Sequence, residues 1–211
     1  TKSNTTITAT AVTAPDGTST ADKVVETATV TVAHYVGADY TTTAENYTIT
    51  VYAKAGELDK FELGATTDNR GVAFDLTAGT VIALSGYYGL AGTGSIEALA
   101  NGWYRCRCTW TATAVSNGIR VVLRKLAANT YTGDGTSGLY IWGAQLEAGA
   151  FATSYIPTVA SQVTRAADVA VMTGSNFSSW YNQSEGTFVA EYSRPSAIAN
   201  SFVLDVSNNT F

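Results

Sequence analysis

The sequence predicts an all-β protein, built as an antiparallel sandwich or barrel. Apolar residues show almost no helical periodicity. Short runs rich in Thr, Val, Ile, Tyr and Phe instead recur at intervals of roughly 8–12 residues, with Gly, Asp and Asn between them. Hydrophobic residues make up 45% of the chain and charged residues only 14%. This composition can form a core and argues against global disorder.

Turn residues divide the first 157 residues into a series of expected strands. Pro15-Asp16-Gly17, Asn101-Gly102 and Ser116-Asn117-Gly118 are examples of these turns. The expected strands are 5–12, 22–31, 47–54, 61–66, 72–75, 80–84, 95–99, 103–112, 119–124 and 138–147.

The strand 47–54 and the segment after 84 supply candidate aromatic platforms. Alternation points Ile49 and Val51 toward the core and places Tyr52 on the opposite, polar face. Sugars stack their C–H groups on such rings, and tyrosine adds a hydroxyl that orients the ligand. Tyr87 and Tyr88 lie in a Gly-rich segment that we expect to be an exposed loop. We prefer this pair as the ligand platform, the alternative being that both rings only pack within the loop.

The strand 103–112 has the clearest alternation. One face carries Cys106, Cys108 and Trp110, and we expect it to be core, with both cysteines reduced. The opposite face carries Arg105 and Arg107. Their planar guanidinium groups can make paired hydrogen bonds to sugar hydroxyls or carboxylates. The alternative is that these arginines only keep an outer face soluble.

The last strand expected within residues 1–157 and the change in composition after it predict a domain boundary. Trp142 lies in a run that is apolar on both faces, so we expect a central strand with this side chain in the core. We expect residues 1–157 to form one domain and 158–165 a linker. Residues 166–211, with expected strands 169–172, 186–193 and 201–206, then begin a second sandwich that is cut short, so the chain is expected to be a fragment.

Charge and hydropathy exclude two classes of partner. The chain has 12 Lys and Arg against 17 Asp and Glu, a net charge of -5, and no basic cluster. This argues against nucleic-acid binding. No apolar run approaches the roughly 18–20 residues that cross a bilayer, and the first residues do not form a signal peptide. We expect neither a membrane nor a nucleic-acid partner.

The sequence offers little for catalysis or metal binding. His34 is the single histidine and no Gly-x-Ser-x-Gly motif occurs, so we expect His34 at the surface or in a turn and the protein to be non-catalytic. The carboxylates that could form a glycosidase pair are Glu57, Asp59, Glu62, Asp75 and Glu97, and we expect them to be solvated. No metal site or cofactor is expected. A structural calcium ion has only weak support from Asp16, Asp22, Asp68, Asp75 and Asp134, because no EF-hand loop is present.

Four segments in order resemble a known family. They are Gly17-Thr18-Ser19-Thr20-Ala21-Asp22-Lys23-Val24, Tyr47-Thr48-Ile49-Thr50-Val51-Tyr52-Ala53-Lys54-Ala55-Gly56, Asn101-Gly102-Trp103-Tyr104-Arg105-Cys106 and Leu139-Tyr140-Ile141-Trp142-Gly143-Ala144-Gln145-Leu146-Glu147. Together they resemble the carbohydrate-binding-module-like jelly rolls of bacteriophage tail-fibre, head-fibre and other virion proteins. The resemblance covers about residues 5–157.

The segments that follow resemble a junction to a second domain. Ser154-Tyr155-Ile156-Pro157-Thr158 and Thr164-Arg165-Ala166-Ala167-Asp168 are similar to the sequence that precedes a concanavalin A-like lectin/glucanase sandwich in such proteins. Glu185-Gly186-Thr187-Phe188-Val189-Ala190-Glu191-Tyr192 is similar to the first strands of that domain.

The resemblance implies a jelly-roll module located in a virion, made in the cytoplasm of a bacterial host. It implies binding of a polysaccharide or host-surface glycan, with other virion subunits as partners and a homo-oligomeric state. Calcium-binding relatives often carry an acidic residue near the position of Trp142-Gly143, which is absent here. Two functions remain open. The first is a carbohydrate-binding module that uses Tyr52, Tyr87, Tyr88, Arg105 and Arg107. The second is a purely structural, oligomerising virion protein.

Overall fold

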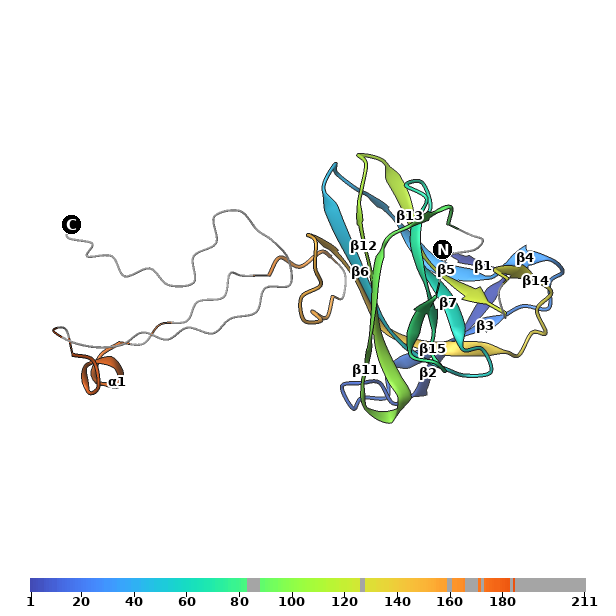
Figure 1. The fold of residues 1–211 in the computed structure, drawn as a ribbon. Helices are drawn as coiled ribbons and strands as arrows, with labels where there is room; N and C mark the ends of the chain where they lie inside the picture. Colours follow the sequence, from blue (N-terminus) through green and yellow to red (C-terminus); the bar gives the residue numbers. More distant parts are fainter. Residues whose placement is uncertain are drawn as a thin grey trace. The chain divides into compact units, whose positions relative to one another are not determined.

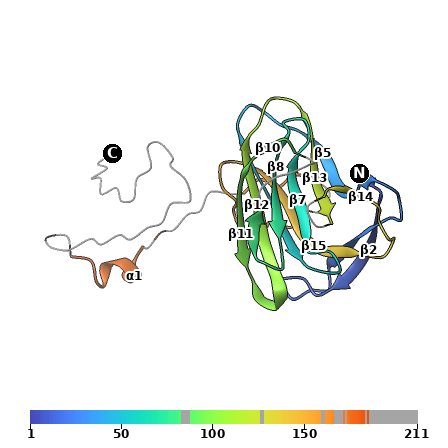
Figure 2. The same cartoon turned by 45° about the vertical axis from the view of Figure 1, so that its right-hand side comes forward.

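A computed structural model describes residues 1–82, 88–125, 128–158, 161–165, 171, 173–182 and 184. The chain divides into two units, Thr1–Pro157 and Thr158–Phe211. The first unit consists of two β-sheets packed face to face (Figures 1 and 2). The all-β sandwich that the strand pattern predicts is therefore confirmed.

Sheet A has seven strands, all antiparallel to their neighbours except β10, which runs parallel to β8. In spatial order they are β1 (Lys2–Ser3), β5 (Tyr35–Thr41), β13 (Ser116–Arg124), β7 (Lys60–Ala65), β8 (Arg70–Asp75) and β10 (Leu90–Ala91), with β9 (Thr80–Ile82) also paired to β8.

Sheet B has six strands and is antiparallel throughout. In spatial order they are β11 (Thr93–Ala98), β12 (Trp103–Thr111), β6 (Asn46–Lys54), β15 (Gly138–Ala148), β3 (Ala21–Glu26) and β2 (Thr5–Val12). A 3-10 turn, Ala100–Gly102, joins β11 to β12. The short strands β4 (Val32–Ala33) and β14 (Thr130–Tyr131) form a separate pair.

The connections between the long strands follow a jelly-roll order. The chain passes from β3 in sheet B to β5 in sheet A, back to β6 in sheet B, and on to β7 and β8 in sheet A. It then alternates again through β12, β13 and β15. Some strands that are neighbours in a sheet, such as β6 and β15 or β5 and β13, are therefore distant in sequence, as in the Greek-key connections of a jelly roll.

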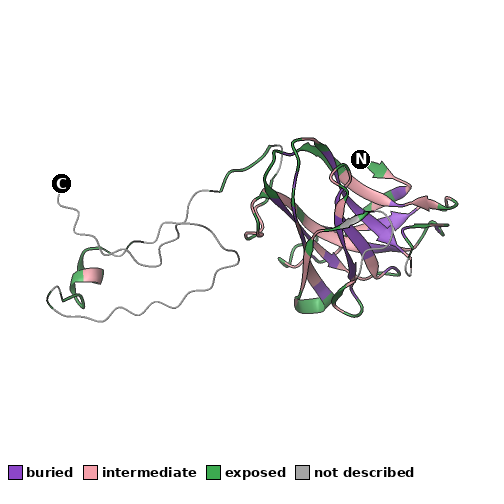
Figure 3. Ribbon diagram, turned by 45° about the horizontal axis from the view of Figure 1, so that its top comes forward, coloured by how far each residue is buried: buried purple, intermediate pink, exposed green. Residues whose placement is uncertain are grey.

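The core lies between the two sheets, where Figure 3 shows the buried stretches of the strands. Phe61 and Phe74 stack there with their ring centroids 5.2 Å apart. Cys106 and Cys108 are buried with free thiols, which confirms their expected place in the core. Burial raises the pKa of Cys108 to about 12, because a thiolate in an apolar site loses its hydration.

The outer face of sheet A is also covered, which the sequence pattern did not reveal. Glu62 and Arg124 lie on this face as a buried ion pair, with 3.1 Å between Oε1 and Nη1. The expectation that Glu62 is solvated is therefore wrong. Its alternation relative to Phe61 and Leu63 was correct, but the face to which it points is closed to water at this position.

Two features of the strands differ from the prediction. β5 was not expected, because Tyr35–Thr41 lacks a regular apolar alternation and contains Gly37 and Asp39. Trp142 is not in the main core. It lies half-buried on the outer face of sheet B, next to Gly143, whose φ of +58° belongs to a register shift in β15 between Trp142 and Gln145.

In the second unit the structure describes a short helix, α1 (Ser175–Ser178), that was not predicted. The strands expected at 169–172, 186–193 and 201–206 fall outside the described residues, apart from Val171. Within the described part of the chain, no helix is long and apolar enough to cross a membrane.

Candidate functional site

The outer face of sheet B brings three of the five candidate residues together. Arg105 on β12 lies opposite Tyr52 on β6, and Tyr52 lies opposite Trp142 on β15. Arg107, two positions from Arg105, lies opposite Thr50. The alternation of the sequence therefore placed Tyr52, Arg105 and Arg107 correctly on one shared surface.

Tyr52 belongs to a cluster of three aromatic rings. Its ring centroid lies 5.1 Å from that of Trp142, at an interplanar angle of 67°, and 6.5 Å from that of Tyr155. The guanidinium carbon of Arg105 lies 5.9 Å from the Tyr52 centroid, within the range of a cation–π contact. Edge-to-face rings and a cation form a well-packed group, in which the Tyr52 ring is only partly exposed.

The chain itself covers this cluster. Residues 149–157, which we call the strap, follow β15 and fold back over the outer face of sheet B (Figure 1). Arg105 donates through Nη2 to the carbonyl of Thr153. The backbone N–H of Ile156 donates to Oε1 of Gln145 at 2.8 Å, and Tyr155 packs on Trp142. Tyr52 and Arg105 therefore hold the strap and do not form an open platform.

Arg107 lies on the same face with 30% of its side chain exposed. Its Nη2 is 3.7 Å from Oε2 of Glu97, a long and partly screened contact. The Nε atoms of Arg105 and Arg107 are buried and have no hydrogen-bond partner within the described structure. Arg107 therefore keeps part of its side chain exposed to solvent, whereas Arg105 is hydrogen-bonded to Thr153.

Tyr88 does not lie in an exposed loop, and that expectation is wrong. Its side chain is only 2% exposed and packs against Gly71 on the outer face of sheet A. A Cβ at Gly71 would lie 2.6 Å from Cγ of Tyr88, so the absence of a side chain at Gly71 makes room for the ring. Tyr88 Oη donates to the carbonyl of Arg120 at 3.4 Å. Tyr87 lies outside the described residues.

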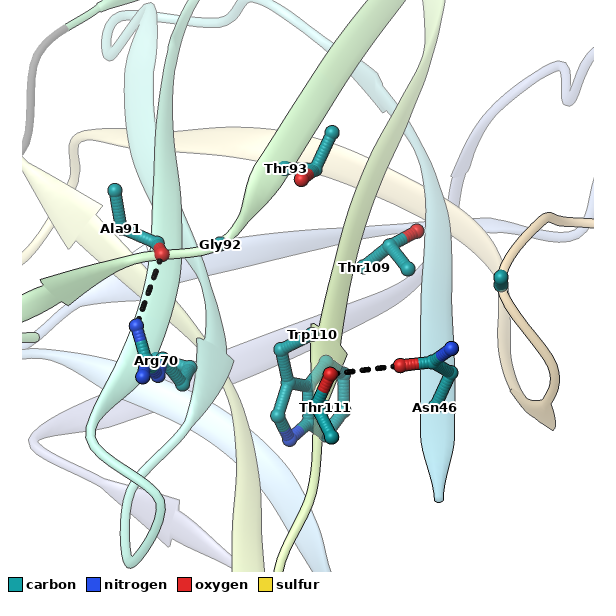
Figure 4. A pocket seen from close by; sticks show the side chains of 9 residues that line it. Asn46, Arg70, Ala91, Gly92, Thr93, Thr109, Trp110 and Thr111 are labelled. Atoms are coloured by element: carbon teal, nitrogen blue, oxygen red, sulfur yellow. Dashed lines mark hydrogen bonds between the residues drawn. The ribbon is translucent and has the colours of Figure 1, made fainter. Parts of the chain in front are cut away.

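A polar depression lies where the edges of the two sheets meet, beside the arginine-bearing face (Figure 4). Its volume is about 400 Å³. Hydroxyl, amide and guanidinium groups dominate its side-chain chemistry. It is lined by Asn46, Arg70, Ala91, Gly92, Thr93, Thr109, Trp110, Thr111 and Ala150.

Local sequence explains how the depression forms. The chain leaves sheet A at β10 and enters sheet B at β11 through Gly92, whose N–H donates to the carbonyl of Gly71 at 2.9 Å. A Cβ at Gly92 would lie 2.7 Å from Sγ of Cys108, so this close crossing requires glycine. The crossing turns the chain away from the end of β12 and leaves Trp110 at the base of the depression and Thr111 on its rim.

A hydrogen-bonded carboxylate fixes Trp110 at the base of the depression. Asp68 Oδ2 accepts from Nε1 of Trp110 at 3.0 Å and from Nδ2 of Asn117 at 2.8 Å, and its Oδ1 accepts from the backbone and the hydroxyl of Thr113. Burial alone would raise the pKa of Asp68, but the donors outweigh it and hold the pKa below its usual value. The base of the depression is therefore rigid.

On the rim, Thr111 donates through Oγ1 to Oδ1 of Asn46 at 2.8 Å. In Figure 4 the amide nitrogen of Asn46 points away from Thr111. The next outward-facing pair on β6 and β12 is Thr48 and Thr109, whose hydroxyl oxygens lie 2.8 Å apart. Sequence reasoning missed this depression. The Thr-x-Thr pattern of β12 was visible, but the corner at Gly92 depends on how two distant strands meet.

His34 and the five carboxylates considered for catalysis do not form one site. His34 is fully buried, contrary to the expected surface position, with Nδ1 2.7 Å from the carbonyl of Asn4 and Nε2 3.3 Å from that of Tyr131. Asp59 and Asp75 both bind Lys60, at 2.9 and 3.0 Å. The other three carboxylates contact different cations, Glu57 with Lys23, Glu62 with Arg124 and Glu97 with Arg107.

The aspartates considered for calcium are likewise engaged within the chain. Asp16 accepts from Thr18, Asp22 from the N–H of Thr10, and Asp134 from Ser137. Within the described residues, no three side chains of the metal-binding types gather around one point.

No protein-family model matches this chain, and no curated protein is similar to it in sequence.

Proposed function

We propose that this chain is a non-catalytic module of a bacteriophage virion protein, of the fibre or decoration type, and that it binds carbohydrate in the polar depression. The observation that carries the proposal is the chemistry of the depression. Its side chains offer donors and acceptors around a concave surface, above the hydrogen-bonded Trp110.

Sugars present many hydroxyl groups at fixed angles, so a site that binds them needs several polar groups held in place. Asn46 and Thr111 are joined to each other across neighbouring strands, and Thr109 is joined to Thr48. Because these residues lie on strands of sheet B, their positions are set by backbone hydrogen bonds and not by a mobile loop.

The proposal gives Tyr52 and Arg105 a supporting role. They hold the strap on sheet B, and Ala150 of the strap lines one side of the depression. The aromatic cluster therefore contributes to the site indirectly, by holding the strap in place. Trp110, only 4% exposed, forms its floor and offers no open ring face for stacking.

The virion setting follows from the resemblance in sequence, with host-surface glycan as the ligand and other virion subunits as partners. A shallow polar site without an open aromatic platform binds weakly, with a dissociation constant of about 1 mM as the order of magnitude. Many copies on one particle would raise the effective affinity through avidity. We therefore also propose that the protein forms a homo-oligomer.

One observation favours a second function, that of a purely structural virion module. The aromatic cluster is filled by the chain's own Tyr155, which fixes residues 149–157 on the sandwich. A face whose aromatic rings are already covered by the chain itself suits a packing module better than an open sugar platform. In that case the depression would have no ligand.

A glycan array screened with the multimerised full chain tests the proposal. Thr111→Val removes a hydroxyl from the depression with little change in shape, and Thr8→Val makes the same change at an exposed threonine of β2, at the far side of sheet B. We expect the wild type and Thr8→Val to bind the same glycans and Thr111→Val to bind them more weakly. A folded wild-type protein that binds no glycan would favour the structural module.

A further inference from the structure

Arg70 is set apart from most other arginines of the sandwich by its lack of an acidic partner. Within the described residues it forms no ion pair, and its Nη1 makes a long hydrogen bond to the carbonyl of Ala91 at 3.4 Å. The arginines with acidic partners are Arg107, Arg120 and Arg124, which bind Glu97, Asp39 and Glu62.

Among the described residues, the side chains that line the depression with Arg70 do not include an acid (Figure 4). The carboxylate of Asp68 accepts from four side-chain or backbone donors beneath Trp110. In a chain with a net charge of -5, a guanidinium that faces a concave polar surface without an acid is a distinct electrostatic feature.

A guanidinium group has five N–H donors in a plane and matches a carboxylate with two parallel hydrogen bonds. With one weak carbonyl contact, Arg70 retains most of these donors. The hydroxyls of Thr93 and Thr111 and the amide of Asn46 lie around the same concavity, where they could take the hydroxyl groups of a sugar ring. The depression thus combines one anion-binding group with several polyol-binding groups.

We infer that the ligand of the depression is an acidic glycan, whose sugar carboxylate binds Arg70 while its hydroxyl groups bind Asn46 and the threonines. The inference rests on the proposed function and adds the class of sugar to it. The carboxylate can belong to a hexuronate or to a sialate, since both carry a planar carboxylate on a hydroxylated sugar ring.

The test is a binding titration of the full chain with matched pairs of sugars. Tetragalacturonate and α2,3-sialyllactose are each compared with their methyl esters, because esterification removes the charge of the carboxyl group and leaves the rest of the sugar unchanged. We expect at least one acidic sugar to bind about tenfold more tightly than its neutral partner. The pair that shows the difference identifies the source of the carboxylate.

Two variants assign the preference to Arg70. Arg70→Gln should bring the affinity for the acidic sugar down to that for its neutral partner, and Arg70→Lys should give an intermediate preference, because lysine keeps the charge but not the planar donors. Circular dichroism confirms that each variant is folded. A preference for the acidic sugar that Arg70→Gln retains, or equal affinities in the wild type, would overturn this inference and leave carbohydrate binding standing. Absence of binding to all four sugars would count against both.

Discussion

The ring of Tyr155 lies on that of Trp142, with 4.6 Å between the two centroids and an interplanar angle of 53°. The residues between them form the end of β15 and the first part of the strap, so this contact closes the strap onto sheet B. Burial of two aromatic rings against each other is favourable beyond the area that it removes from water. The strap is therefore a packed part of the sandwich.

Replacement of Tyr155 tests this packing. Tyr155→Ala should lower the free energy of unfolding by about 1–2 kcal/mol, because it removes the ring that covers Trp142 and Tyr52. Tyr155→Phe keeps the ring and should stay close to the wild type. Urea unfolding measures both, and equal stability of the alanine variant and the wild type would mean that the strap is not held there.

The close contact between Gly71 and Tyr88 predicts a steric effect. Gly71→Ala should destabilise the protein by about 1–3 kcal/mol, because its Cβ would overlap the Tyr88 ring. Gly17→Ala is the control. A Cβ at Gly17 meets nothing within 4 Å, and only its φ of +87° opposes the change, at a cost of about 1 kcal/mol. Thermal unfolding should rank Gly71→Ala as the less stable variant, and the opposite order would contradict the buried position of Tyr88.

The hydrogen bonds to Asp68 predict a pH dependence. Because they hold its pKa below the usual 3.8, its carboxylate stabilises the folded state above that pH, and the contribution is lost as the pH falls through the folded-state pKa. Asp68→Asn should be less stable than the wild type by about 1–3 kcal/mol at neutral pH, with a smaller difference in acid. Glu97→Gln, at an exposed carboxylate, serves as the control. A difference that does not change with pH would refute the assigned charge.

Burial of the two cysteines predicts that they are unreactive. Burial raises the pKa of both thiols, so almost no thiolate forms at mildly alkaline pH, and neither sulfur is accessible. Ellman's reagent should react with the folded protein only slowly, and with both thiols once guanidinium chloride unfolds it. Rapid reaction of the folded protein would contradict the core position of Cys106 and Cys108.

Strand alternation predicted the parts of this fold that depend on local pattern. It placed Cys106 in the core and Arg105 and Tyr52 on the opposite face, because the side chains of a strand alternate with period two. It could not predict what covers a face from outside. Glu62 is buried beside Arg124 and Tyr88 against Gly71, and the pattern of a single strand carries no signal of such contacts with residues distant in sequence.

The same limit applies to the candidate site. The five residues proposed from sequence were chosen by residue type and alternation, and the structure assigns two of them, Tyr52 and Arg105, to holding the strap. The depression arises from the meeting of β8, β10 and β12 near Gly92. Arg70, between the expected strands 61–66 and 72–75, gave no sign of its role, because that role depends on which side chains meet in three dimensions.

Chemical-shift mapping by NMR tests carbohydrate binding in the depression most directly, since it detects weak binding and locates it in one experiment. The full chain, labelled with nitrogen-15, is titrated with a panel of neutral and acidic oligosaccharides at millimolar concentrations. We predict saturable shifts at the backbone amides of Asn46, Arg70, Thr93 and Thr111, with those of β2 unchanged. Shifts confined to other parts of the chain, or no shifts with any sugar, would contradict a carbohydrate site in the depression.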